Sequence, residues 1–197
     1  MAASKNEILQ IKSTLQGIRP PIWRRIQIPA SETFWGLHCA IQDAMGWDDM
    51  HLHSFRARHR KYGDIEIRVP WDGEENEEFL DFLPDWECKI RDCLRKAKDQ
   101  CLYKYDFGDG WKHIVELEKI LPAEPDVSYP VCVTGRRACP PEDCGGVWGY
   151  MRLLEALKNP ENVQHKELLE WLGDRFDPEA FDPDAVRFTD PEERMLF

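Results

Sequence analysis

The sequence has no apolar run that approaches the ~20 residues needed by a membrane-spanning helix. Its N-terminal segment lacks the basic stretch and the apolar core of a secretory signal. It also lacks a phosphate-binding loop, a dinucleotide-binding fingerprint, a nucleophile elbow and a zincin helix. The seven cysteines are odd in number and follow no secreted disulfide framework, which favours a reducing compartment. We therefore expect a cytoplasmic protein without a membrane partner and outside several common enzyme classes.

Positive charge is scarce as well, because 26 Lys and Arg residues face 37 Asp and Glu residues, for a formal net charge of −11. Residues 1–70 carry 10 basic and 7 acidic side chains, whereas residues 71–197 carry 16 and 30. The C-terminal two-thirds are thereby excluded as a nucleic-acid surface, and the N-terminal part remains eligible. Residues 71–86 hold seven acidic side chains and no basic one, which predicts a solvated connection able to dock onto the N-terminal arginines of the same or another chain.

Hydrophobic spacing predicts an α+β fold in one domain spanning residues 1–197. The expected sheet is antiparallel or mixed, built from two hairpins and a central strand, with one helix packed on it and a helical C-terminal part. The expected elements are a hairpin over 9–28, a helix over 33–45, a strand over 51–59, a short helix over 86–98, a hairpin over 101–121 and a helical tail over 147–187. In that tail, Asp177-Pro178 predicts the start of a last short helix.

The hairpin over 101–121 has the clearest local pattern, because aromatic and aliphatic residues alternate on both sides of a Gly-Asp-Gly turn. A two-residue loop would pair Asp106 with His113. A three-residue loop would pair Tyr105 with His113 and Phe107 with Trp111, with the second glycine in the left-handed conformation. We expect the three-residue loop, because it keeps the apolar face continuous.

Four segments of the chain together resemble a known family. They are Gly-Ile-Arg-Pro-Pro-Ile-Trp-Arg-Arg at 17–25, Ile-Gln-Asp-Ala-Met-Gly-Trp with His-Leu-His-Ser-Phe within 41–55, Tyr-Asp-Phe-Gly-Asp-Gly-Trp-Lys-His at 105–113, and Gly-Arg-Arg-Ala-Cys-Pro-Pro-Glu-Asp-Cys-Gly-Gly at 135–146. This pattern is similar to the family named after the third open reading frame of a root-inducing (Ri) plasmid. The resemblance implies an α+β domain found on plasmids and near mobile elements, and it implies no particular activity.

The sequence offers thiolate and imidazole side chains for a metal site. Three cysteines lie in a loop rich in Pro and Gly, where a tetrahedral zinc ion bound by thiolates and one imidazole would act as a staple. The candidate metal ligands are Cys132, Cys139 and Cys144, with His51, His53 or His113 as the fourth. His51 and His53 lie two apart on the expected strand, so both would point to one face about 6.6 Å apart. The alternative is that the cysteines are half-buried thiols and the histidines pack in the core.

The turn of the 101–121 hairpin carries the candidate catalytic residues Asp106, Asp109 and His113. Two carboxylates beside an imidazole suit acid–base or metal chemistry. Each of the three also has a structural interpretation, since Asp109 is a turn former, Asp106 would face Lys112 and His113 would join the aromatic face.

Basic side chains in the N-terminal part are the candidate contacts to nucleic acid or another anion. They are Arg19, Arg24, Arg25, Arg56, Arg58 and Arg60. There is no helix-turn-helix signature, and DNA is disfavoured by the net charge. Binding through these side chains requires that all six share one exposed face.

Three hypotheses follow for the function. The favoured one is a non-enzymatic interaction module with a protein partner, associated with plasmid or mobile-element biology. The alternative is a metal-dependent enzyme of hydrolytic type that uses a His/Asp/Cys cluster, with zinc as the candidate cofactor. The third is DNA binding through the basic N-terminal part. Convergence of the His51/His53, Asp106/His113 and Cys132–Cys144 regions in one concave pocket would favour the enzyme, whereas separate positions buried in apolar surroundings would favour the interaction module.

Overall fold

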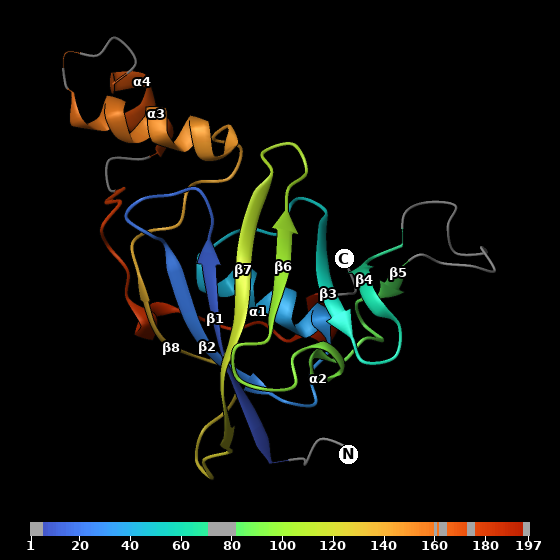
Figure 1. Cartoon of the computed structure of the whole chain (residues 1–197). Coiled ribbons are helices and arrows are strands. Elements are labelled where there is room, and N and C mark those ends of the chain that lie inside the picture. Colours follow the sequence, from blue (N-terminus) through green and yellow to red (C-terminus); the bar gives the residue numbers. More distant parts are fainter. Residues whose placement is uncertain (1–5, 71–81, 160, 162–164, 173–175, 195–197) are drawn as a thin grey trace.

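The computed structural model describes residues 6–70, 82–159, 161, 165–172 and 176–194, and its centre is one eight-stranded sheet (Figure 1). The strand order is β5-β4-β3-β6-β7-β1-β2-β8. Every neighbouring pair is antiparallel except β4 and β5, which are parallel. The expected α+β class and the mixed sheet are therefore confirmed. No helix among the described residues is long and apolar enough to cross a membrane.

The strands and helices alternate irregularly along the chain. The strands are β1 (Glu7–Leu15), β2 (Trp23–Pro29), β3 (His53–His59), β4 (Gly63–Arg68), β5 (Phe82–Pro84), β6 (Gln100–Tyr105), β7 (Trp111–Pro122) and β8 (Val131–Arg136). The helices are α1 (Phe34–Met45), α2 (Ile90–Cys93), α3 (Gly146–Lys158), α4 (His165–Leu172), the 3-10 turn η1 (Pro183–Ala185) and α5 (Pro191–Arg194).

Helix α1 lies against one face of the sheet, and its ends follow from the sequence (Figure 1). The Thr33 side chain accepts a hydrogen bond from the Gly36 N–H and so caps the N-terminus of the helix. Gly46 ends the helix in the left-handed conformation, with φ of 86°. The apolar stripe that begins with Phe34 and ends with Met45 is buried as expected.

The β6–β7 hairpin keeps the predicted faces but not the predicted register. Tyr103 pairs with His113 and Tyr105 pairs with Trp111, so the loop spans residues 106–110 and the three-residue loop is wrong. A shift of two residues preserves which side chains face inward, because the side-chain period of a strand is two. Phe107 therefore leaves the core and is 46% exposed, and Gly110 has the expected positive φ.

Three strands were not expected, and one begins later than expected. Strands β4, β5 and β8 carry weak alternation, and β5 has only three residues. Strand β3 begins at His53, so His51 lies before it in a bend. Of the acidic connection 71–86, residues 71–81 lie outside the described residues, and the rest supplies β5 and the buried Asp85. The predicted helix over 86–98 contracts to the four residues of α2.

The C-terminal part is helical at first and extended afterwards. Helices α3 and α4 lie together beyond one end of the sheet (Figure 1). Asp177-Pro178 forms a turn instead of starting a helix, and the same Asp-Pro pattern at Asp182 caps η1. The last described residues return to α1, where Arg194 pairs with Asp43 at 2.6 Å.

Three histidines lie in the core and are held by polar partners. His38 and His113 are fully buried and His53 is 5% exposed. The His113 Nδ1 atom lies 2.9 Å from the Ser13 hydroxyl on the neighbouring strand β1. Burial and the nearby positive charge of Arg24 lower the pKa of His113 to about 3, so this side chain is neutral in the folded protein.

We expect stability to fall as the pH decreases below 6.5. In this range His113 of the unfolded chain becomes protonated, whereas His113 of the folded protein stays neutral down to about pH 3. His113→Asn removes this contribution. Between pH 7 and pH 5 the free energy of unfolding of the wild type should drop by about 2 kcal/mol more than that of the variant. Urea unfolding at both pH values measures the difference, and equal losses would contradict the prediction.

Candidate metal centre

Three loops meet at the end of the sheet where β6 turns into β7. The site loops are residues 47–52 after α1, residues 105–110 in the hairpin turn, and residues 141–146 before α3. Two of them are in direct contact, because the Asp109 carboxylate accepts the Gly145 N–H at 3.1 Å. A Cβ atom at Gly146 would lie 2.3 Å from the Asp109 carbonyl oxygen, so this close approach requires glycine.

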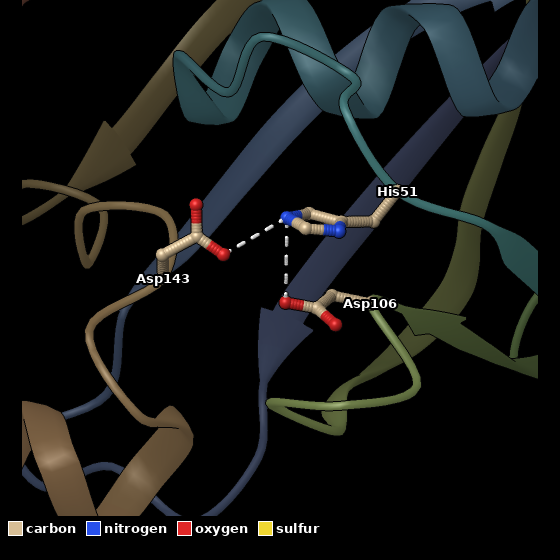
Figure 2. A group of neighbouring side chains, drawn as sticks. All are labelled: His51, Asp106 and Asp143. Carbon is tan, nitrogen blue, oxygen red and sulfur yellow. Dashed lines mark ion pairs between the residues drawn. The ribbon is translucent and has the colours of Figure 1, made fainter.

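One side chain from each site loop points to a common place (Figure 2). The His51 Nε2 atom lies 3.1 Å from Asp143 Oδ1 and 3.7 Å from Asp106 Oδ2. The three ligand atoms all lie within 4.8 Å of one another. Ligands bound to a zinc-sized ion at about 2.1 Å are separated by about 3.4 Å in a tetrahedron, and the two measured distances bracket this value.

The ligand atoms are oriented by their surroundings. Asp106 Oδ1 accepts the N–H groups of Gly108 and Asp109, which leaves Oδ2 directed toward His51. The His51 Nε2 atom is buried and has no hydrogen-bond partner within the described part of the chain. It forms ion pairs with Asp106 and Asp143, so one ring nitrogen and two carboxylate oxygens face one another, a donor set that could hold a cation. Asp143 is exposed, so the centre opens to solvent on that side.

The hydroxyl group of Tyr105 connects the three site loops. Tyr105 immediately precedes Asp106 in the chain. Its hydroxyl accepts the N–H of Met50, next to His51, and donates to the carboxylate of Glu142, next to Asp143. Burial and the Glu142 carboxylate raise the pKa of Tyr105, so the hydroxyl keeps its proton. One phenol thereby links residues that are next in sequence to all three ligands.

A second contact holds the loop that carries His51. Asp49, two residues earlier, lies 2.8 Å from the Nε2 atom of the buried His38 and 3.7 Å from Arg194. Burial and the stacked ring of His53 lower the pKa of His38 to about 4. His38 is therefore a neutral donor to Asp49 near neutral pH.

The other candidate ligands lie elsewhere. His51, Asp106 and Asp143 form the one group of three metal-ligating side chains among the described residues, and the three candidate cysteines form none. His53 points into the core toward Asp85 at 2.7 Å, so the expectation that His51 and His53 share one face is wrong. His113 is bound to Ser13, and Asp109 supports Gly145.

The six candidate arginines do not share one exposed face. Arg24 is 1% exposed, and its guanidinium donates to the carbonyl groups of Ala44, Trp23 and Arg136. Arg25 pairs with Glu118 on the open face of the sheet, and Arg60 pairs with Asp92. Arg19, Arg56 and Arg58 are exposed. Alternation along β2 turns Arg24 inward, which contradicts the condition set for DNA binding.

Sequence reasoning missed Asp143 and the connecting hydroxyl of Tyr105. In the 135–146 segment the cysteines were the candidate ligands, although Glu142-Asp143 lies between Cys139 and Cys144. A pair of acidic residues in a loop fixed by prolines and glycines was the signal that could have found this ligand. Tyr105 carried no such signal, because its alternation with Tyr103 predicts only a core position.

Fold and site together define the class: an α+β protein with one mixed sheet and a candidate His-Asp-Asp metal centre at one end. The chain belongs to the Plasmid pRiA4b ORF-3-like protein family, whose match covers residues 7–185. The Uncharacterized protein y4hQ of Sinorhizobium fredii is 36% identical over 170 residues, which are 84% of this chain and 81% of that protein. MM3350 of Methanosarcina mazei Go1, a protein of unknown function, has a crystal structure similar to this one. Its TM-score is 0.85 at 43% identity, over 94% of this chain and all of that one.

We expect Tyr105→Phe to weaken metal binding without a large loss of stability. The variant keeps the ring, which packs on Trp47, and removes only the hydroxyl that joins the site loops. Loss of such an outer contact should raise the dissociation constant for Zn²⁺ about 10- to 100-fold. Tyr150→Phe is the matched control, since that buried hydroxyl has no hydrogen-bond partner in the described structure. Titration calorimetry measures both, and equal affinities would contradict the connecting function of Tyr105.

Proposed function

We propose that this protein binds a divalent transition-metal ion through His51, Asp106 and Asp143 and that the bound ion serves a metal-dependent, hydrolytic activity. The observation that carries the proposal is the convergence of three loops, distant in sequence, on one nitrogen and two oxygen ligand atoms. His51, Asp106 and Asp143 come from the three regions named for a metal-dependent enzyme, whereas His53 and His113 lie in the core and the cysteines are not part of the group.

The ligand set favours some ions over others. Imidazole suits Zn²⁺, Fe²⁺ and related ions, and carboxylates suit a wider range that includes Mn²⁺. A mixed set of one imidazole and two carboxylates therefore fits Zn²⁺ or Mn²⁺ better than Ca²⁺ or Mg²⁺, which prefer oxygen alone. Three protein ligands leave one or more coordination positions for water or substrate, which is typical of catalytic and not of structural zinc sites.

The two carboxylate ligands differ in their exposure to solvent, and we assign them different roles. Asp106 is nearly buried and fixed by two backbone N–H groups, so it anchors the ion. Asp143 is 74% exposed and marks the side from which substrate approaches. An ion held by these residues would lower the pKa of a coordinated water and would so supply a nucleophile for hydrolysis.

The interaction-module hypothesis has a weaker basis in this structure. Exposed apolar side chains on α3 and α4, Trp148, Met151 and Trp171, would serve a protein partner, but nothing near them indicates its chemistry. An association with plasmid or mobile-element biology rests on the name of the family alone. The metal centre rests on the placement of three named ligand side chains and is the better supported proposal.

We expect chelator-treated protein to bind one Zn²⁺ or Mn²⁺ ion per chain and to be stabilised by it. At a free metal concentration of about 100 times the dissociation constant the gain is about 2.7 kcal/mol, a shift in melting temperature of roughly 5–10 °C for a chain of this size. His51→Ala and Asp106→Asn should each abolish the shift. Asp64→Asn, an exposed carboxylate on β4, is the control and should retain it. An unchanged shift in His51→Ala would overturn the proposed centre.

A further inference from the structure

We infer that the metal centre selects ligands that carry positive charge and an apolar group, and that it rejects anions such as phosphate esters. The inference rests on the proposed function, since it concerns what binds beside the same ion. Its substrate class is an amide or ester of a basic, peptide-like molecule. Two observations carry it: the uncompensated negative charge of the site loops and the apolar side chains that these loops expose.

The site loops contain six carboxylates and no Lys or Arg side chain. The carboxylates are Asp48, Asp49, Asp106, Asp109, Glu142 and Asp143. A divalent ion bound to two carboxylates is neutralised by them, and four negative charges remain around it. Arg194 offsets one of these four in part, because its guanidinium lies 3.7 Å from Asp49. An approaching dianion therefore meets a net negative surface despite the metal ion.

The groove beside Asp143 does not change the net negative charge around the metal centre. Its volume is about 430 Å³, and it lies between the 141–146 loop, α3 and α4. The one cation in its lining is Arg152, and Glu167 faces the same groove from α4. The two helices thus add no net positive charge to the approach to the metal ion.

The same site loops expose large apolar side chains. Met50 is 73% exposed, Leu52 is 54% exposed and Phe107 is 46% exposed. Met50 and Leu52 flank one metal ligand, and Phe107 follows another. The N–H of Asp106 donates to the carbonyl of Leu52, so the backbone of Leu52 lies against the residue before Phe107. Apolar surface exposed next to a candidate metal site marks a place for the apolar part of a ligand.

The test uses Zn²⁺-loaded full-length protein and four N-acetyl amino-acid hydroxamates, which share one metal-binding group and differ in the side chain. The lysine, norleucine and glutamate derivatives carry a positive, an apolar and a negative side chain, and the alanine derivative carries only a methyl group. We expect the lysine compound to bind about 10-fold more tightly than the glutamate compound at low salt, and the difference to shrink at high salt. We expect norleucine to bind more tightly than an alanine derivative.

Two variants assign the preference to named side chains. Asp48→Asn removes an exposed charge whose carboxylate makes no hydrogen bond or ion pair among the described residues, and it should lower the lysine-to-glutamate ratio about 3-fold. Asp64→Asn, distant on β4, should leave the ratio unchanged. Phe107→Ser should remove the advantage of norleucine over alanine while the affinity for Zn²⁺ stays the same.

The outcomes separate this inference from the proposed function. Failure of Zn²⁺ itself to bind overturns the metal centre and the inference with it. Normal Zn²⁺ binding with equal affinity for the lysine and glutamate compounds, or with preference for glutamate or inorganic phosphate, overturns the charge selection alone. Zn²⁺ binding with the expected order, followed by cleavage of a lysine amide or ester and not of a phosphate ester, supports the substrate class.

Discussion

The structure depends on a pair of imidazole rings stacked between helix and sheet. His38 of α1 and His53 of β3 lie with ring centroids 3.5 Å apart at an angle of 8°, and each ring ends on a carboxylate, Asp49 and Asp85 respectively. The Tyr103 hydroxyl receives an N–H from Gln42 and lies 2.9 Å from His38 Nδ1, to which it can donate. This chain of contacts joins α1, β3, β6 and the residue after β5. The position of α1 on the sheet is therefore fixed by buried polar contacts as well as by apolar packing.

The same contacts determine where the candidate centre lies. Asp49 lies two residues before His51, and its carboxylate accepts a hydrogen bond from the buried His38 ring. Tyr105, beside Tyr103 on β6, joins the remaining loops through its hydroxyl. A metal ligand on a free loop would be placed loosely, whereas these three are fixed by buried polar groups that the fold already requires. The centre is thus an extension of the core and not an addition to the surface.

The sequence predicted those parts of the fold that repeat locally. Alternation set the inward faces of β1, β2, β6 and β7, and hydrophobic spacing located α1. Alternation could not fix the β6–β7 register, because a shift of two residues leaves every face unchanged, and the exposed Phe107 looked like a core residue. Strands β4, β5 and β8 depend on pairing with distant partners, which no local pattern reports. Of the three proposed metal ligands, His51 and Asp106 were among the candidates and Asp143 was not, because its function arises only where three loops meet.

Part of the net charge of −11 is concentrated at one end of the sheet. As an average it argues only against nucleic acid, yet six of the acidic side chains lie on three short loops that contain no Lys or Arg. Like charges gathered at one place destabilise a fold unless something offsets them. Arg194 and the backbone N–H groups at Asp106 and Asp109 offset part of this charge, and a divalent cation would offset more. Negative charge at this end of the sheet is therefore an argument for a bound cation, and it also determines which molecules can approach that cation.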